Sequence, residues 1–158
     1  MKVLLFKGRG FMSAAIRWQS RSIYSHAAIQ LRDGSIIESW QGDGVRQKLL
    51  TDWKGIDAFD IVNAPDIGIE LDEDGCEEFL RAQIGKDYDY SSVLRFVSRR
   101  KGGNPNRWFC SELVFSALGY AGVDLFERCD PWRVSPGMLV YSPFLSRAQR
   151  YAVLRPRF

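Results

Sequence analysis

The stretch WFCSELVFSAL, residues 108–118, is the part of the chain that decides the fold and the candidate chemistry. It follows the segment KGGNPN at residues 101–106, whose glycine, proline and asparagine are typical of a loop. Apolar residues then recur at helical spacing, which predicts a helix that begins near Cys110. Cys110 would lie beside the unpaired N–H groups of the first turn, where the helix dipole favours a thiolate. The alternative is a buried cysteine that only packs.

The turn and loop residues in the rest of the sequence separate apolar segments that predict a strand-rich first part and a helix-rich second part. This order is typical of the α+β class, in which helices pack on an antiparallel sheet. At 158 residues the chain is expected to form a single domain, residues 1–158. We predict strands over residues 2–7, 24–31, 35–40, 58–62 and 149–155, and helices over residues 11–19, from about 72 to 84, about 90–98, and from Cys110 onward.

Composition excludes several classes of function. Lys and Arg (22) exceed Asp and Glu (19) by only three, without the basic runs of a nucleic-acid groove. No run approaches the roughly 18–20 apolar residues of a transmembrane helix. The apolar run at the start is too short for a secretory signal, so we expect a cytoplasmic protein, although a phage-encoded or otherwise exported protein can also lack a signal. The oligomeric state is not indicated.

The cysteines and the histidine do not form a metal-binding pattern. The three cysteines form no C-x-x-C pair, and they accompany only one histidine. This count supports neither a disulfide framework nor a structural zinc site, and free thiols in a reducing compartment fit better. We expect no metal and no cofactor. Cys76 is assigned to the core face of a helix and Cys129 to a loop.

His26 is that single histidine, and it lies in the predicted strand YSHAAIQL at residues 24–31. Strand alternation places it on the less apolar face, opposite to Ala27 and Ile29. A nucleophilic cysteine needs a base that accepts its proton and later protonates the leaving group, and an imidazole can do both. His26 is therefore the candidate base. A hydrogen-bonded strand histidine without a catalytic role is the alternative.

Glu38 is the candidate for a third group, one that orients the imidazole and stabilises its charged form. Its position depends on the register of the hairpin whose turn contains residues 32–34. A two-residue turn would pair Ile29 with Glu38 and put the carboxylate on the apolar face. A three-residue turn with a left-handed glycine instead pairs Ala28 with Glu38, which places the carboxylate on the face of His26. We predict the second register, because it keeps the charge away from the apolar face.

Six short segments, taken in order, resemble one protein family. They occur between roughly residues 6 and 140, which is most of the chain. We interpret the set as a resemblance to the circularly permuted NlpC-type, papain-like cysteine hydrolases of the YiiX-like branch. In unpermuted relatives the cysteine helix precedes the histidine strand, whereas here the histidine comes first. The segments are YSHAAI (24–29), IIES (36–39), GVRQ (44–47), GKDYD (85–89), FCSELV (109–114) and SPGML (135–139).

The resemblance implies a papain-like fold, in which a small antiparallel sheet or barrel packs against the cysteine helix. It also implies a triad without metal, formed by Cys110, His26 and Glu38; the third position varies in residue type within the family. Three aromatic residues are candidates for substrate binding. Tyr88, in the GKDYD segment, falls where the family places an aromatic residue near the site, and the others are Tyr24 and Trp108.

The activity implied by the resemblance is hydrolysis of an amide in a small or cell-wall-like peptide, through an acyl-enzyme. Two alternatives stay open. One is a lipid-directed acyltransferase, thioesterase or phospholipase, like the lecithin–retinol acyltransferase relatives, whose N-C-E-H-F-like signature differs from FCSEL at residues 109–113. The other is a ligand-binding module without turnover. The expected partner is accordingly a small peptide-like or acyl substrate.

Overall fold

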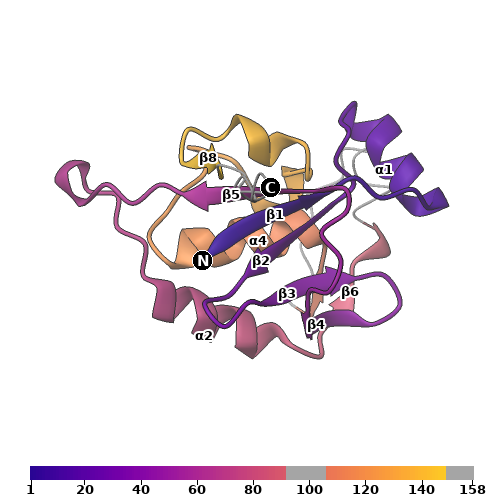
Figure 1. Ribbon diagram of the computed structural model, residues 1–158, viewed down its shortest axis with the longest axis horizontal. Helices are drawn as coiled ribbons and strands as arrows, with labels where there is room; N and C mark the ends of the chain where they lie inside the picture. Colours follow the sequence, from indigo (N-terminus) through magenta and orange to yellow (C-terminus); the bar gives the residue numbers. More distant parts are fainter. Residues whose placement is uncertain (92–105, 149–158) are drawn as a thin grey trace, which may run out of the picture.

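The structure, a computed structural model, describes residues 1–91 and 106–148 of the chain. Its centre is an antiparallel sheet of six strands in the order β4-β3-β2-β1-β5-β8 (Figure 1). Two further short strands form a separate parallel pair. The sheet consists of β1 (Lys2–Phe6), β2 (His26–Gln30), β3 (Ser35–Trp40), β4 (Gly44–Leu49), β5 (Ile56–Ile61) and β8 (Leu145–Arg147), and the pair of β6 (Asp87–Tyr88) and β7 (Arg107–Trp108).

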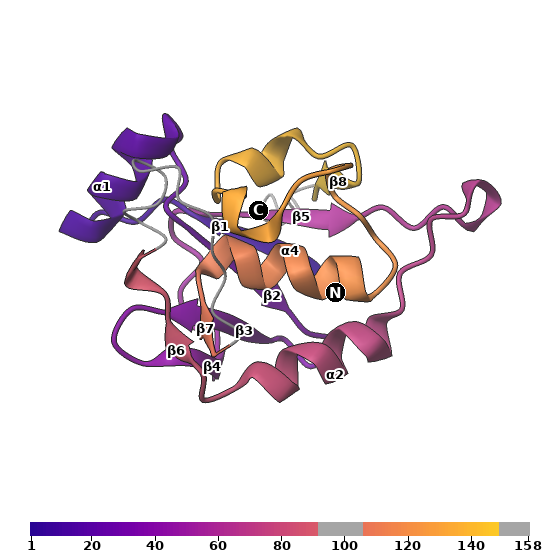
Figure 2. The same cartoon turned by 180° about the vertical axis from the view of Figure 1, so that it is seen from behind.

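Two helices, α2 and α4, lie over one face of the sheet, whereas α1 lies at one end of it (Figure 2). The described part of the chain is therefore a mixed α+β fold, as the sequence predicts. None of the described helices is both long and apolar enough to cross a membrane. The helices are α1 (Phe11–Ser20), α2 (Glu73–Gln83) and α4 (Cys110–Tyr120), with short 3-10 turns η1 (Pro65–Ile67), η2 (Pro131–Arg133) and η3 (Met138–Tyr141).

The predicted elements that fall on described residues are confirmed within a few positions. The sequence pattern did not predict β4, because its second half alternates charged and polar side chains with few apolar ones. The helix expected over about 90–98 runs into residues 92–105, and the strand expected over 149–155 lies wholly in the last ten residues. Both of these predictions fall outside the described residues.

The main core lies between the sheet and its two covering helices. Its buried side chains come from alternate positions of β1, β2 and β3 and from one face each of α2 and α4. They include Val3, Leu5, Ala27, Ile29, Ile37, Cys76, Leu80, Leu113, Val114, Ala117 and Leu118. Cys76 is thus a core residue, as predicted, and Cys129 lies half-buried in a loop.

The opposite face of the sheet carries His26 and is the less apolar of the two, as the sequence predicts. Leu4, Ala28 and Ile36 are fully buried there and form a second cluster, with Phe6 packed against it. This cluster is smaller than the main core, and the same face carries the buried carboxylate of Glu38. The neighbouring strands β1 and β3 supply the apolar side chains that cover this face.

The β2–β3 hairpin has the predicted three-residue turn. Ile29 pairs with Ile37, and Gln30 with Ile36. The backbone N–H of Leu31 donates to the carbonyl of Ser35 at 2.8 Å. Gly34 has a left-handed φ of 85°, a conformation in which a Cβ is disfavoured. This register brings Glu38 to the face of the sheet that carries His26.

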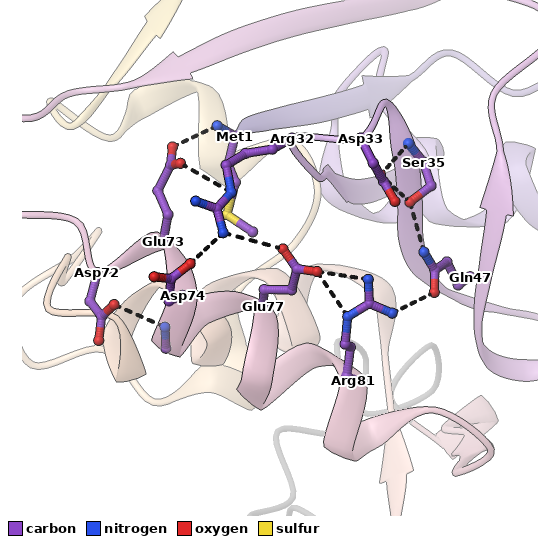
Figure 3. A network of polar contacts seen from close by, with 11 residues as sticks. Met1, Arg32, Asp33, Ser35, Gln47, Asp72, Glu73, Asp74, Glu77 and Arg81 are labelled. Atoms are coloured by element: carbon purple, nitrogen blue, oxygen red, sulfur yellow. Dashed lines mark hydrogen bonds and ion pairs between the residues drawn. The ribbon is translucent and has the colours of Figure 1, made fainter.

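An ion-pair network fastens α2 to the hairpin and to β4 (Figure 3). Arg32, in the hairpin turn, contacts Asp74 and lies 3.9 Å from Glu77. Arg81 bonds the same Glu77 at 2.7 Å and donates to Gln47 of β4 at 2.9 Å. The helix is thereby held against the same strands that carry the candidate site.

Gly44 allows β4 to approach the loop before β6. Its φ is 72°, and an added Cβ would collide with the backbone carbonyl of Lys86. Next to it, the N–H of Val45 donates to that carbonyl at 2.8 Å, and Gly85 donates to Val45 at 2.9 Å. This contact places the segment that contains Tyr88 beside the sheet.

Candidate active site

Cys110 is the first residue of α4, as the sequence predicts. Phe109 before it is extended, with φ −87° and ψ 151°. The carboxylate of Glu112 accepts the N–H of Phe109 at 3.4 Å, which satisfies one of the unpaired donors at the helix start. The hydroxyl of Ser111 donates to the carbonyl of Val134 at 2.6 Å. These two contacts fix the helix start and explain Glu112 as a capping residue.

The start of α4 is tied directly to the strand that carries Glu38. Ser39, the next residue of β3, donates its hydroxyl proton to the carbonyl of Trp108 at 2.7 Å. The N–H of Asp89 donates to the same carbonyl at 3.0 Å. Residues far apart in the sequence therefore meet where β7 leads into α4.

His26 lies between a carboxylate and a thiol. Its Nε2 is 2.7 Å from Oε2 of Glu38. The Cys110 side chain is hydrogen-bonded to the imidazole and interacts with its charge. The three residues predicted to act together therefore form one contiguous chain of contacts.

Glu38 is held by two cations of β4 in addition to His26. Its carboxylate is fully buried, and Oε1 accepts from Arg46 at 2.9 and 3.1 Å and lies 3.0 Å from Lys48. Arg46 and Lys48 also lie over the ring of Trp40, at 5.0 and 5.3 Å from its centroid. Trp40 in turn meets the His26 ring edge-on at 5.0 Å. Both oxygens of the buried carboxylate thus have partners.

These contacts set the charges of the pair. Burial disfavours the imidazolium of His26, yet the neighbouring Cys110 and Glu38 outweigh burial and raise its pKa from 6.5 to about 9. Burial also disfavours the carboxylate of Glu38. His26, Lys48 and Arg46 outweigh that effect and lower the pKa of Glu38 from 4.5 to about 2. At neutral pH both groups are therefore charged.

A small pocket opens beside the imidazole, and its wall comes from four separate segments. It is lined by Met12, Ser13, Ile16, Ser25, His26, Trp40, Gln41 and Tyr88. The Cys110 side chain is fully buried and is not part of this lining. It packs with Ile16, Tyr88 and Phe109, and Met12 is packed against the same cluster. Helix α1 therefore covers the thiol.

Gly8 lets the β1–α1 loop reach the pocket. Its N–H donates to the hydroxyl of Ser25 at 3.0 Å. An added Cβ at this position would collide with the hydroxyl oxygens of Ser13 and Ser25. The absence of a side chain thus brings the start of α1 against the residue that precedes His26.

The structure brings one of the three predicted aromatic residues into the site. Tyr88 lines the pocket, and burial, followed by the charge of Cys110, raises its pKa. Tyr24 instead points into the main core, where its hydroxyl donates to Asp57 at 2.5 Å. Trp108 contacts α2, because its indole N–H donates to Gln83 at 3.2 Å and its ring lies 6.0 Å from Phe79.

The structure adds residues that sequence reasoning missed. Arg46 and Lys48 contact Glu38. These two residues are two positions apart on β4 and therefore share one face of the sheet, and Arg46 pairs directly with Glu38. This pattern could have predicted that they bind the carboxylate. The covering role of Met12 and Ile16 had no comparable signal. An apolar face on a short helix does not reveal which surface it covers.

Comparisons with known proteins show the fold alone. A scan against models of protein families finds no match, and no curated protein matches. Among solved structures, the chain is similar to metalloprotein yiiX from Escherichia coli O157:H7, DUF1105, with a TM-score of 0.67. The alignment covers 93% of this chain and 94% of that chain at 17% sequence identity. The chain therefore has a YiiX-like fold.

That neighbour is a metalloprotein. Within residues 1–91 and 106–148, no group of three or more His, Cys, Asp or Glu side chains could hold a metal ion. The single histidine already has Glu38 and Cys110 as partners. The described residues thus do not fit a metal site.

Proposed function

We propose that this protein is a cysteine-dependent amide hydrolase that acts through an acyl-enzyme. One observation carries the proposal: the only imidazole of the chain contacts both a buried carboxylate and a cysteine at a helix N-terminus. Cys110 is the nucleophile, His26 the base and acid, and Glu38 the group that orients and charges the imidazole. This is the arrangement of an activated thiol.

In the first half of the reaction the Cys110 sulfur attacks the carbonyl carbon of the amide. The backbone N–H of Cys110 belongs to the first turn of α4, where N–H groups have no acceptor within the helix, so it is the candidate donor to the developing oxyanion. The imidazolium of His26 then gives its proton to the leaving nitrogen. The carbon–nitrogen bond breaks, an amine departs, and a thioester remains on Cys110.

In the second half a water molecule attacks the thioester, and the neutral imidazole of His26 accepts its proton. The carbon–sulfur bond breaks, and the acid product leaves. The released Cys110 sulfur again lies beside the protonated imidazole. Glu38 stays ionised throughout, because its low pKa and its contacts with Arg46 and Lys48 favour the charged form.

We further propose that the YiiX-like fold of this chain is the permuted papain-like type and that it forms one domain. The histidine strand β2 precedes the cysteine helix α4 in the chain, which is the order in the permuted family. The substrate would be a small peptide-like amide whose acyl part enters beside Tyr88. Since Met12 and Ile16 cover the thiol, α1 has to shift when substrate binds.

The test is hydrolysis of a panel of small peptide amides, including cell-wall-like peptides, by the parent and by Cys110→Ala. We expect Cys110→Ala to form no thioester intermediate and to have a kcat/KM at least about 10³-fold below that of the parent. Cys76→Ala is the matched control, because it removes a buried thiol from the main core. Equal turnover by Cys110→Ala and the parent would refute the proposal.

A second measurement separates the amide hydrolase from the lipid-directed alternative. Peptide-like and lipid-like acyl probes are offered to the parent protein, and the mass of the labelled Cys110 peptide is determined. The proposal expects labelling by the peptide-like probe. Labelling by the lipid-like probe alone would reverse the assignment in favour of an acyltransferase or thioesterase.

A further inference from the structure

A basic hollow shares helix α1 with the active-site pocket. It has a volume of about 540 Å³, within the range of ligand pockets. The lining comes from the β1–α1 loop, from α1 and from the loop before β5, which meet at one end of the sheet (Figure 1). We define this basic hollow by its lining residues, which are Lys7, Gly8, Arg9, Arg17, Asp52, Lys54 and Gly55.

Positive charge is concentrated in the basic hollow. Lys7 is already paired with Asp57 at 2.7 Å, which leaves Arg9, Arg17 and Lys54 against the single carboxylate of Asp52. The surplus is two positive charges, whereas the entire chain has a formal net charge of only +3. Asp52 closes its own turn, because it accepts the backbone N–H of Lys54 at 2.8 Å. No ion pair within the described residues neutralises Arg9, Arg17 or Lys54.

We infer that the basic hollow binds a phosphate group of a small ligand. A phosphate monoester has a charge of about −1.5 to −2 at neutral pH, which matches the surplus, whereas a carboxylate supplies only −1. Two guanidinium groups suit this ligand, since each can donate two parallel hydrogen bonds to phosphate oxygens. The lysine adds a point charge.

The basic hollow is connected to the active site by short contacts. Arg17 lines the basic hollow, whereas Ile16, its neighbour on α1, lines the active-site pocket. Gly8 lines the basic hollow and donates to Ser25 of the pocket wall at 3.0 Å. A phosphate bound here therefore lies against the helix that covers Cys110. If the proposed hydrolase function holds, this is where a phosphorylated substrate anchors.

Binding is measured on Cys110→Ala, so that the result does not depend on turnover. Inorganic phosphate is titrated by calorimetry at constant ionic strength, with chloride as the reference anion. We expect saturable binding, which Arg17→Gln and Lys54→Gln each weaken about tenfold, since each removes a charge-assisted hydrogen bond. Arg128→Gln is the matched control, because it removes the same charge from an exposed loop outside the basic hollow.

Two further arms identify the source of the phosphate. Glycerol phosphate represents a soluble ester, and phosphatidylcholine vesicles containing phosphatidic acid represent a lipid headgroup. If glycerol phosphate or the phosphatidic acid vesicles bind, and Arg17→Gln but not Arg128→Gln weakens this binding, the site is supported. The ligand that binds then identifies the source of the phosphate. The inference is overturned if inorganic phosphate does not saturate, or if Arg17→Gln and Lys54→Gln bind it as the Cys110→Ala protein does. Neither outcome bears on hydrolysis by Cys110.

Discussion

The protonation of His26 offers a direct test of the active-site geometry. The chain has one histidine, so a protein without a histidine tag gives one imidazole signal in the NMR spectrum of histidine-labelled material. We expect this signal to titrate with a midpoint near pH 9. The rise from 6.5 to about 9 corresponds to about 3 kcal/mol, because each pKa unit is worth about 1.4 kcal/mol.

Two substitutions divide this effect between its causes. Glu38→Gln removes the carboxylate but keeps a hydrogen-bonding oxygen, and we expect the midpoint to fall by about one to two pKa units. Cys110→Ala should lower it further, because Cys110 contributes more to the rise than Glu38. With both changes only burial remains, and burial lowers the pKa of a histidine below 6.5. Circular dichroism at each pH checks that the fold persists.

The sign of the pH dependence follows from the raised pKa. The charged imidazole stabilises the folded protein fully below pH 6.5, and this contribution is lost as the pH rises through about 9. Amide hydrolysis should decline over the same range, because the imidazolium that protonates the leaving group disappears. A parent protein that titrates at pH 6.5 or below would refute the contacts assigned to His26.

Three further predictions concern other parts of the structure. Iodoacetamide should modify Cys110 faster than Cys76 at pH 8, as measured by peptide mass spectrometry, because burial in the main core raises the pKa of Cys76 to about 12, whereas Cys110 interacts with the base His26 and is covered by α1, which has to shift for substrate. Equal rates would favour a binding module. Asp57→Asn should lower the free energy of unfolding by about 1–2 kcal/mol at pH 7 in urea titrations. That deficit should shrink below pH 3.8, because the folded-state pKa of this carboxyl is about 2 and its contribution is lost towards that value; a deficit that does not change with pH would contradict this. Gly44→Ala should cost more than about 1 kcal/mol, since φ is 72° and the Cβ meets the next loop; unchanged urea stability would show that this loop can move.

Much of the candidate site could be predicted from local sequence patterns. The loop-to-helix transition predicted Cys110 at a helix start, because glycine, proline and asparagine end one element and an apolar helical period begins the next. The turn at residues 32–34 predicted the register that turns Glu38 towards His26. Both features depend on near neighbours in the chain, and both are confirmed.

Other features depend on which distant segments meet, and the pattern of one segment contains no such information. Tyr24 and Trp108 each lie two residues before a site residue, yet Tyr24 packs into the core and Trp108 against α2. The second apolar face of the sheet arises only when β1 and β3 flank β2. The cover of α1 over Cys110 likewise results from packing between elements.

The sequence by itself determined the residue types, the mixed α+β class and the local geometry of the hairpin and the cysteine helix. Those properties follow from backbone preferences and from periods of two and 3.6 residues, which act over short stretches. Only the tertiary structure decided that a buried carboxylate, an imidazole and a thiol meet, and that a basic hollow lies beside them. Burial and charge act through space, so their effect is set when remote segments pack together.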